Sequence, residues 1–124
     1  MSLTTGLAAV DLAVLASYEE AQIEGEPDFV VELIDLYLDE VPRLFDSIHT
    51  AIQNDDSSTA KRAAHSLRGS SGNLGVLQIA AIAGELEHLP NPCGTSATQL
   101  LQSLETELQR VKEILNAERQ KRSR

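Results

Sequence analysis

The sequence predicts an all-α fold, an up-and-down antiparallel four-helix bundle preceded by one extra short helix. Apolar residues recur at intervals of three and four in nearly every segment, which is the period of an amphipathic helix, and no alternating pattern of useful length indicates a strand. The segments between these helical stretches are short and rich in Pro, Gly, Asn and Asp. Short connections favour antiparallel neighbours, which completes the prediction of an up-and-down bundle.

The length of the chain sets the scale of this bundle. With 124 residues and 42% hydrophobic content, residues 1–124 can form one domain with an apolar core. No run of about 18 apolar residues occurs, and the first residues lack the basic start and apolar segment of a secretory signal. We therefore expect a cytoplasmic, monomeric protein with no membrane segment.

The first two helices are expected from Asp11 to about Gln22 and from about Asp28 to Asn54. Residues 24–27, Glu-Gly-Glu-Pro, separate them, and Pro27 suits the first turn of the second helix. Pro42 predicts a kink or a break within the second helix, since proline removes a backbone hydrogen bond. The expected inner faces are Leu12, Leu15 and Ala16 in the first helix, and Val30, Ile34, Tyr37, Val41, Leu44, Ile48 and Ile52 in the second.

Three further helices are expected over about Ser58–Leu74, Val76–Leu89 and Ser96–Arg119. The polar turn at residues 54–58 supplies capping oxygens for the first of these, and a Pro- and Gly-rich loop at residues 90–94 precedes the last. The polar end, about residues 117–124, is expected to fray. The inner stripe of the last helix is Ala97, Leu101, Leu104, Leu108, Val111 and Leu115.

The charge of the chain argues against nucleic-acid and anionic-membrane partners. The formal net charge is −9, and both of these partners are themselves negative. Only four basic residues precede residue 110, and three of them, Lys61, Arg62 and Arg68, lie within four positions of His65. The local charge around this histidine is therefore opposite to that of the chain as a whole.

A helical wheel places His65 on the outer face of its helix. Ala60, Ala63, Ala64, Leu67, Ser70, Ser71 and Leu74 gather on one side, and Ser58, Lys61, Arg62, His65, Arg68, Gly69 and Gly72 gather on the other. Each feature has an ordinary explanation, such as a solvated histidine, a soluble face, or glycines that permit close helix packing. Their coincidence favours a histidine that carries a phosphoryl group, because neutral imidazole is a nucleophile and cations stabilise the transferred charge.

The stretch AHSLRGSSGNLG, residues 64–75, closely resembles the signature of histidine phosphotransfer (HPt) domains. The resemblance extends from Val10 to about Leu108 and includes DLAVL at residues 11–15, EPDFVVELIDLYLDEVPRLFDSI at residues 26–48 and GELE at residues 84–87. It implies a non-enzymatic phosphorelay carrier of two-component systems. Its implied partners are response-regulator receiver domains, a hybrid sensor histidine kinase, or both.

The resemblance also implies roles for individual residues. His65 matches the phosphoryl acceptor, Arg68 the residue that stabilises the phosphate, and Gly69 a small position that gives a receiver domain access. Lys61, Arg62 and Gly72 are expected to take part in docking the partner. Glu87 falls where members of the family often have a Gln or Glu that accepts a hydrogen bond from the imidazole, and an ordinary solvated carboxylate is the alternative.

No cofactor and no metal site are expected in this chain. It contains no Gly-rich nucleotide-binding motif, and neither His49 nor His88 has a potential ligand three or four residues further along. The resemblance implies that Mg²⁺ is held only by the partner receiver domain.

Two other functions are compatible with a helical bundle. A metal or cofactor protein would place Glu and His ligands inward, whereas the inner stripes here consist mainly of Leu, Ile, Val and Ala. An adaptor that docks receiver domains or other partners without being phosphorylated is the alternative that remains open.

Overall fold

The computed structural model describes residues 9–91 and 94–122, and within them all regular structure is helical. The elements are α1 (Leu12–Ser17), the 3₁₀-helix η1 (Tyr18–Ala21), α2 (Phe29–Gln53), α3 (Ser57–Asn73), α4 (Leu77–His88) and α5 (Thr95–Arg122). The predicted all-α class is confirmed. No described helix combines the length and apolar character that crossing a bilayer requires.

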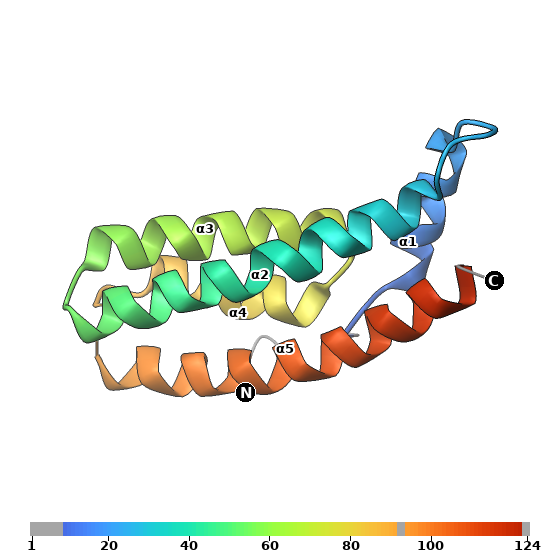
Figure 1. Cartoon of the computed structure of the whole chain (residues 1–124). Helices are drawn as coiled ribbons and strands as arrows, with labels where there is room; N and C mark the ends of the chain where they lie inside the picture. The colour runs from blue at the N-terminus through green and yellow to red at the C-terminus, as the bar shows by residue number, and fades with distance from the viewer. Residues whose placement is uncertain (1–8, 92–93, 123–124) are drawn as a thin grey trace.

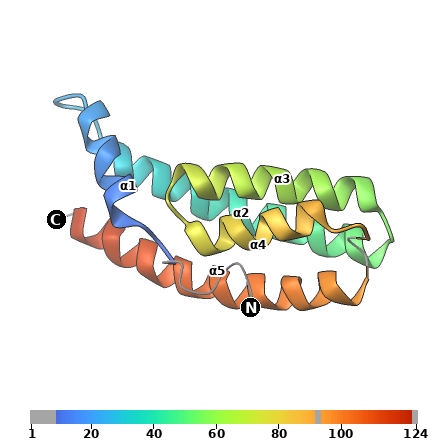
Figure 2. The ribbon, with the colours of Figure 1, turned by 180° about the vertical axis from the view of Figure 1, so that it is seen from behind.

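Helices α2 to α5 form the bundle, and each runs antiparallel to the one before it (Figure 1). Helix α3 packs against α2 and α4, and α5 closes the bundle by packing against the same two helices. Helix α1 and η1 lie at one end of the bundle, where α2 begins and α5 ends (Figure 2). The predicted bundle with one extra N-terminal helix is therefore present.

The core is formed by the faces that the apolar periodicity predicts. The most completely buried large side chains come from all five α-helices and include Leu15, Ile34, Ile48, Leu67, Ile79, Ile82, Leu86, Leu104 and Leu115. Tyr37 and Ser71 join α2 to α3 inside this core by a hydrogen bond of 2.6 Å between their hydroxyl groups. Because each hydroxyl meets the other, both polar groups are buried without losing a hydrogen-bond partner.

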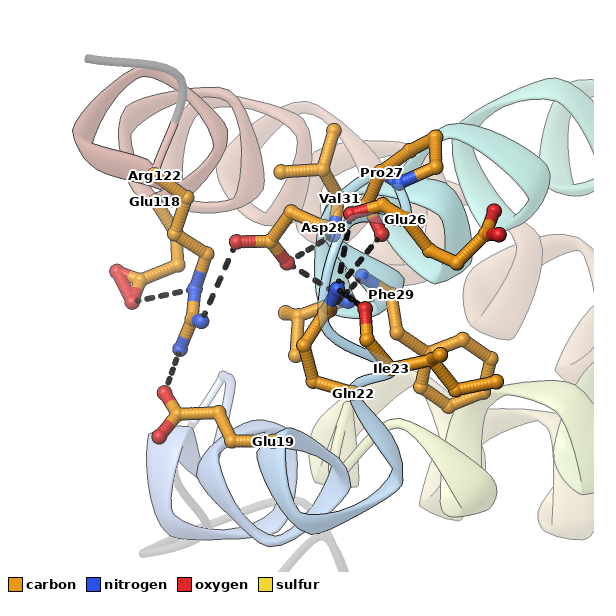
Figure 3. Close-up of polar contacts among 11 residues, drawn as sticks. Glu19, Gln22, Ile23, Glu26, Pro27, Asp28, Phe29, Val31, Glu118 and Arg122 are labelled. Atoms are coloured by element: carbon orange, nitrogen blue, oxygen red, sulfur yellow. Dashed lines mark hydrogen bonds and ion pairs between the residues drawn. The ribbon is translucent and has the colours of Figure 1, made fainter.

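Three of the helices start at aspartates whose side chains cap the first turn. The side chains of Asp11, Asp28 and Asp56 accept hydrogen bonds from backbone N–H groups in the first turns of α1, α2 and α3. Pro27 lies before the Asp28 cap and not in the first helical turn, which corrects the prediction. The Gln22 side-chain amide holds this connection, because its oxygen accepts from the Phe29 N–H at 2.7 Å (Figure 3).

The predicted inner face of the first helix is only partly correct. Leu15 is buried, but Leu12 is 46% exposed and Ala16 is also exposed. The α-helix ends after six residues and η1 follows it, so a single helical period does not extend across Asp11–Gln22. A short helix at the end of a bundle also has fewer neighbours that can bury a stripe.

Helix α2 continues through Pro42, and the predicted break between two shorter helices does not occur. Pro42 is exposed, so the carbonyl that loses its usual N–H partner lies near the surface. Arg43 adds a side-chain contact here, because its Nε donates to the carbonyl of Asp39 at 3.3 Å. The buried stripe on either side, including Tyr37 and Ile48, holds both halves of α2 on the same core.

Helix α5 continues past the expected end at about Arg119 and is regular to Arg122. Arg122 lies 2.6 Å from a Glu19 oxygen, 3.5 Å from Glu118 and 4.0 Å from Asp28 (Figure 3). Although burial disfavours its charge, the hydrogen bond to Glu19 and the nearby carboxylates raise the pKa of Arg122. These contacts fix the last described turn, while residues 123 and 124 lie outside the described part.

The connection between α3 and α4 depends on Gly75, which has a φ of +74°. A Cβ at this position would lie 2.8 Å from the Cβ of Val14 and 2.9 Å from the carbonyl oxygen of Asp11. The Asp11 N–H donates to the Gly75 carbonyl at 2.7 Å. Glycine is required here both for the left-handed backbone and for the close approach of α1.

Candidate functional site

His65 projects from the outer face of α3. Its side chain is 64% exposed, whereas Ala64 and Leu67, its neighbours on the inner face, are buried. Because those two residues hold α3 on the core, the backbone beneath the imidazole has a fixed position. The ring is thus accessible to another protein and is carried by a rigid element.

Glu87 comes from α4 and engages one nitrogen of this ring. Its Oε2 lies 2.7 Å from His65 Nδ1, and its side chain is only 20% exposed. The adjacent Leu86 is buried in the core and fixes the rotation of α4 that directs Glu87 toward α3. A carboxylate can only accept, so Nδ1 carries the proton in this contact and Nε2 is the nitrogen left for other chemistry.

Arg68 completes a group of three side chains around the imidazole. Its Nε lies 3.3 Å from Glu87 Oε1, and its Nη2 lies 3.4 Å from His65 Nδ1. Both Nη2 and a protonated Nδ1 are donors, so the contact with Nη2 cannot be a hydrogen bond while Nδ1 donates to Glu87. The shorter distance to Glu87 favours the tautomer with the proton on Nδ1.

The electrostatic environment keeps Glu87 ionised. Partial burial opposes its charge, but the hydrogen bond from His65 and the positive charge of Arg68 outweigh it, and the pKa of Glu87 is below its ordinary value of 4.5. His88 contributes in the same direction. The carboxylate can therefore accept from the imidazole throughout the neutral pH range.

The two glycines that follow His65 on α3 have open space beside them. A Cβ at Gly69 or at Gly72 would meet no heavy atom within 4 Å outside the local helix. Close packing against α4, which was one ordinary explanation for these glycines, therefore does not account for them. They leave a strip of exposed backbone along the same face as the imidazole.

The other predicted site residues lie at the edge of this group. Arg62 is exposed, and its Nη2 donates to the Thr59 hydroxyl at 3.4 Å, one turn before His65. Lys61 is partly buried on the same helix. The structure thus brings together His65, Arg68 and Glu87, whereas Lys61 and Arg62 are positioned to add positive charge around them.

The two remaining histidines have other surroundings. The ring of His49 stacks on Phe45 with a centroid separation of 6.2 Å. His88 Nδ1 lies 2.8 Å from the Gly84 carbonyl near the end of α4, where an Nδ1–H can donate to that carbonyl. Neither histidine has the combination of Arg and Glu contacts that His65 has.

Sequence reasoning missed Gly84, which lies on α4 beside the Arg68 side chain. A Cβ there would lie 3.4 Å from Arg68 Cδ. The available signal was a glycine inside a helix, three positions before the candidate Glu87. Gly84 is the first residue of the GELE segment at residues 84–87, but its position relative to Arg68 depends on how α3 and α4 are rotated against each other.

Comparison with known proteins shows to which family the chain belongs. The family model of the Hpt domain matches residues 32–121 of this chain. The chain is also 31% identical over 61 residues to histidine-containing phosphotransfer protein 5 of Arabidopsis thaliana, a match that covers 47% of this chain. That match spans 39% of the length of the plant protein.

Two solved structures have similar folds. Histidine-containing phosphotransfer protein B (HptB) of Pseudomonas aeruginosa PAO1 superposes with a TM-score of 0.82 at 29% identity, covering 91% of this chain and 96% of that chain. The HPT domain of a sensor hybrid histidine kinase from Shewanella gives a TM-score of 0.68 at 19% identity, covering 88% and 92%. At that identity, the Shewanella domain shows a common fold alone.

The matched region contains α3 and α4 completely, and with them the three side chains around the imidazole. The fold, the exposed histidine and the family match agree, and the chain belongs to the Hpt domain family.

Proposed function

We propose that this protein is a phosphorelay carrier that accepts a phosphoryl group on Nε2 of His65. The donor is the aspartyl phosphate of a receiver domain or a kinase, and the acceptor is an aspartate of another receiver domain. The observation that carries this proposal is the 2.7 Å contact between His65 Nδ1 and Glu87, which leaves Nε2 of an exposed ring unengaged by the carboxylate. The protein needs no ATPase or kinase activity of its own for this role.

The transfer requires a neutral imidazole with its proton on Nδ1. The lone pair of Nε2 attacks the phosphorus of the aspartyl phosphate, a P–N bond forms as the P–O bond breaks, and the aspartate carboxylate leaves. The ring becomes positively charged, because the proton stays on Nδ1. The carboxylate of Glu87 stabilises this charge, and the reverse sequence passes the group to the next receiver domain.

Arg68 supplies the positive charge nearest to the site of transfer. In the structure it contacts Glu87, and its side chain is 41% exposed, so its guanidinium can also reach toward solvent. Movement of the guanidinium toward a phosphoryl group on Nε2 gives a charge-assisted contact with the new negative charge. We expect Mg²⁺ to be held by the acidic site of the partner receiver domain.

The strip at Gly69 and Gly72 suits the approach of a receiver domain. With no Cβ at either position, another protein can reach the backbone of α3 next to His65. Lys61 and Arg62 add positive charge near a partner whose active site is acidic. This arrangement supports docking of receiver domains and gives no support for binding to nucleic acid.

Phosphorylation by a purified, phosphorylated receiver domain tests the proposal. The expected result is phosphate on this protein that is labile in acid and stable in base, as expected for phosphohistidine, together with loss of phosphate from the receiver. Incubation with ATP alone is the control and should give no label. Complex formation with receiver domains without any label would identify the adaptor function instead.

A further inference from the structure

Gly84 occupies an interior position in α4, three residues before Glu87. Glycine is among the least favourable residues in a helix interior, so its presence there calls for a physical reason. Its neighbour Ala83 is completely buried, which fixes the rotation of this part of α4 on the core. Gly84 itself is partly exposed and lies on the side of α4 that borders Arg68.

Gly84 borders an open groove on α4, and Arg68 is the side chain that comes closest to it. A Cβ built on Gly84 would lie 3.4 Å from Arg68 Cδ and would meet no other heavy atom within 4 Å outside its own helix. The glycines on α3 differ, because a Cβ at Gly69 or Gly72 would enter open space. Gly84 is therefore in contact with a residue of the candidate site, whereas those two are not.

The Arg68 side chain runs past Gly84 toward the candidate site. The aliphatic part of Arg68 passes over Gly84, and its Nε reaches to 3.3 Å from Glu87 Oε1. The same guanidinium lies 3.4 Å from His65 Nδ1 through Nη2. A β-branched side chain at position 84 would crowd Arg68 Cδ, and we expect this to move the guanidinium away from both neighbours.

We propose that Gly84 is a positioning residue, which lets Arg68 lie across α4 beside Glu87 and His65. The positioning itself is a property of the unphosphorylated protein. Its consequence for phosphoryl transfer rests on the proposed function, because Arg68 must be near Nε2 to stabilise the phosphoryl group.

Graded substitutions at position 84 test this geometry. Gly84→Ala places Cβ at 3.4 Å, which is close to ordinary van der Waals contact, and should leave Arg68 in place. Gly84→Val adds two γ-carbons beside Arg68 Cδ, and we expect them to displace the Arg68 side chain. Gly72→Val is the matched control, because it makes the same exchange on α3 where the structure has open space.

The readout is the pKa of the Glu87 carboxyl group, followed by carbon-13 NMR in the unphosphorylated protein. The charged groups that act on Glu87 are His65 and Arg68 from α3 and His88 from α4. Displacement of Arg68 removes one of the two main contacts that stabilise the ionised carboxylate of Glu87, and the contact with His65 remains. The pKa of Glu87 in Gly84→Val should therefore rise to the value found in Arg68→Ala, while Gly84→Ala and Gly72→Val should match the wild type.

A double-mutant cycle separates positioning from a general disturbance of α4. In the Arg68→Ala background, Gly84→Val should change the pKa of Glu87 no further, because the side chain that it displaces is absent. An unchanged pKa in Gly84→Val, or an equal shift with and without Arg68, would overturn the proposal. Thermal unfolding of each variant identifies any loss of the fold, and Gly84→Ile offers a second β-branched exchange if Gly84→Val unfolds.

The lifetime of phosphohistidine gives a separate measurement. In Gly84→Val it should shorten to the lifetime in Arg68→Ala and no further. If the pKa of Glu87 rises in Gly84→Val but the wild type takes up no phosphate, the positioning role is supported and the proposed function is refuted. If the wild type is phosphorylated normally but the pKa of Glu87 is unchanged in Gly84→Val, the proposed function is supported and the positioning role is refuted.

Discussion

At the scale of single residues, Glu87 divides its carboxylate between two partners. One oxygen accepts from the imidazole of His65 and the other faces the guanidinium of Arg68. A neutral amide at this position could orient the ring but could not balance a positively charged, phosphorylated imidazole. The charge of Glu87 thus links the protonation of the ring to the position of Arg68.

Replacement of Glu87 by Gln should change the dependence of stability on pH. Because the pKa of Glu87 in the folded protein is below 4.5, its ionised form stabilises the fold above that pH. This contribution is lost as the pH falls through the folded-state pKa. The melting temperature of Glu87→Gln should be below that of the wild type near pH 7, and the two should converge as the pH falls below 4.5 and the carboxylate is protonated.

The control for this experiment is Glu113→Gln on α5, which removes one negative charge from an exposed position. It leaves the contacts of the imidazole intact. A difference between wild type and Glu87→Gln that stays constant from neutral to acidic pH would show that the carboxylate has no stabilising partner in solution.

Replacement of Arg68 by Ala should slow phosphoryl transfer without abolishing it. The nucleophile remains, but a charge-assisted contact with the phosphoryl group is lost. This loss should cost on the order of 1.5–3 kcal/mol of phosphoryl stabilisation at most. The partial exposure of Arg68 places the expected effect toward the lower end of that range. The effect is measured from the single-turnover transfer rate and the lifetime of phosphohistidine. Unchanged values for both would show that Arg68 only adds solubility.

At the scale of helices, α3 combines a well-packed inner face with a bare outer face. Ala60, Ala63 and Ala64 let it lie close to its neighbours, and Ser71 adds the hydrogen bond to Tyr37. On the outer face, Gly69 and Gly72 lack side chains where an added Cβ would meet no heavy atom within 4 Å outside the local helix. The packing of the bundle does not require these glycines, and this supports the proposal that they leave room for a partner.

Replacement of Gly69 by Gln should stabilise the protein and impair transfer. The helix gains up to about 1 kcal/mol from the better propensity of glutamine, and no neighbour obstructs the new side chain. The same side chain should block the approach of a receiver domain to His65. Urea unfolding and receiver-dependent transfer measure the two effects on the same sample.

Gly69→Ala separates these effects, since alanine gives the gain in helix propensity with a much smaller side chain. It should unfold at higher urea concentration and transfer nearly as fast as the wild type. Lower stability of both variants would show that position 69 is packed in solution, contrary to the open space in the structure.

The helices could be predicted from the sequence because their signals are local. Helices α2, α3 and α4 start and end within one residue of the positions expected from the sequence, and α5 starts within one residue but ends three residues later than expected. The continuity of α2 through Pro42 and the role of Gly84 could not be predicted in this way. Both depend on contacts between side chains on a turn or a neighbouring helix, which periodicity does not describe.

At the scale of the whole molecule, ion pairs join the last described turn of α5 to η1 and to the start of α2. Arg122 contacts Glu19 near α1, Asp28 at the start of α2 and Glu118 on its own helix (Figure 3). Its side chain is only 16% exposed. The sequence of these last turns is polar, and the contacts of Arg122 with Glu19 and Asp28 join residues that lie about 90 to 100 positions apart.

Arg122→Met should loosen this end and leave the candidate site intact. Methionine keeps much of the apolar stem but removes the charge, and the loss should be about 1 kcal/mol, because Glu19 is largely exposed. Hydrogen exchange should become faster in the last turns of α5. The exposed Lys121→Met is the matched control, and equal effects of both exchanges would show that the Arg122 contacts do not stabilise the end of the helix.

The measurement that tests the central claim most directly compares His65→Gln with the wild type, after both have been incubated with the same phosphorylated receiver domain. Because the imidazole is exposed and α3 is held by its inner face, the variant should keep its helicity and unfold at nearly the same temperature. We predict that it takes up no acid-labile phosphate, while the wild type is labelled on His65. Labelling of a folded His65→Gln protein, at His49, His88 or any other residue, would contradict the account.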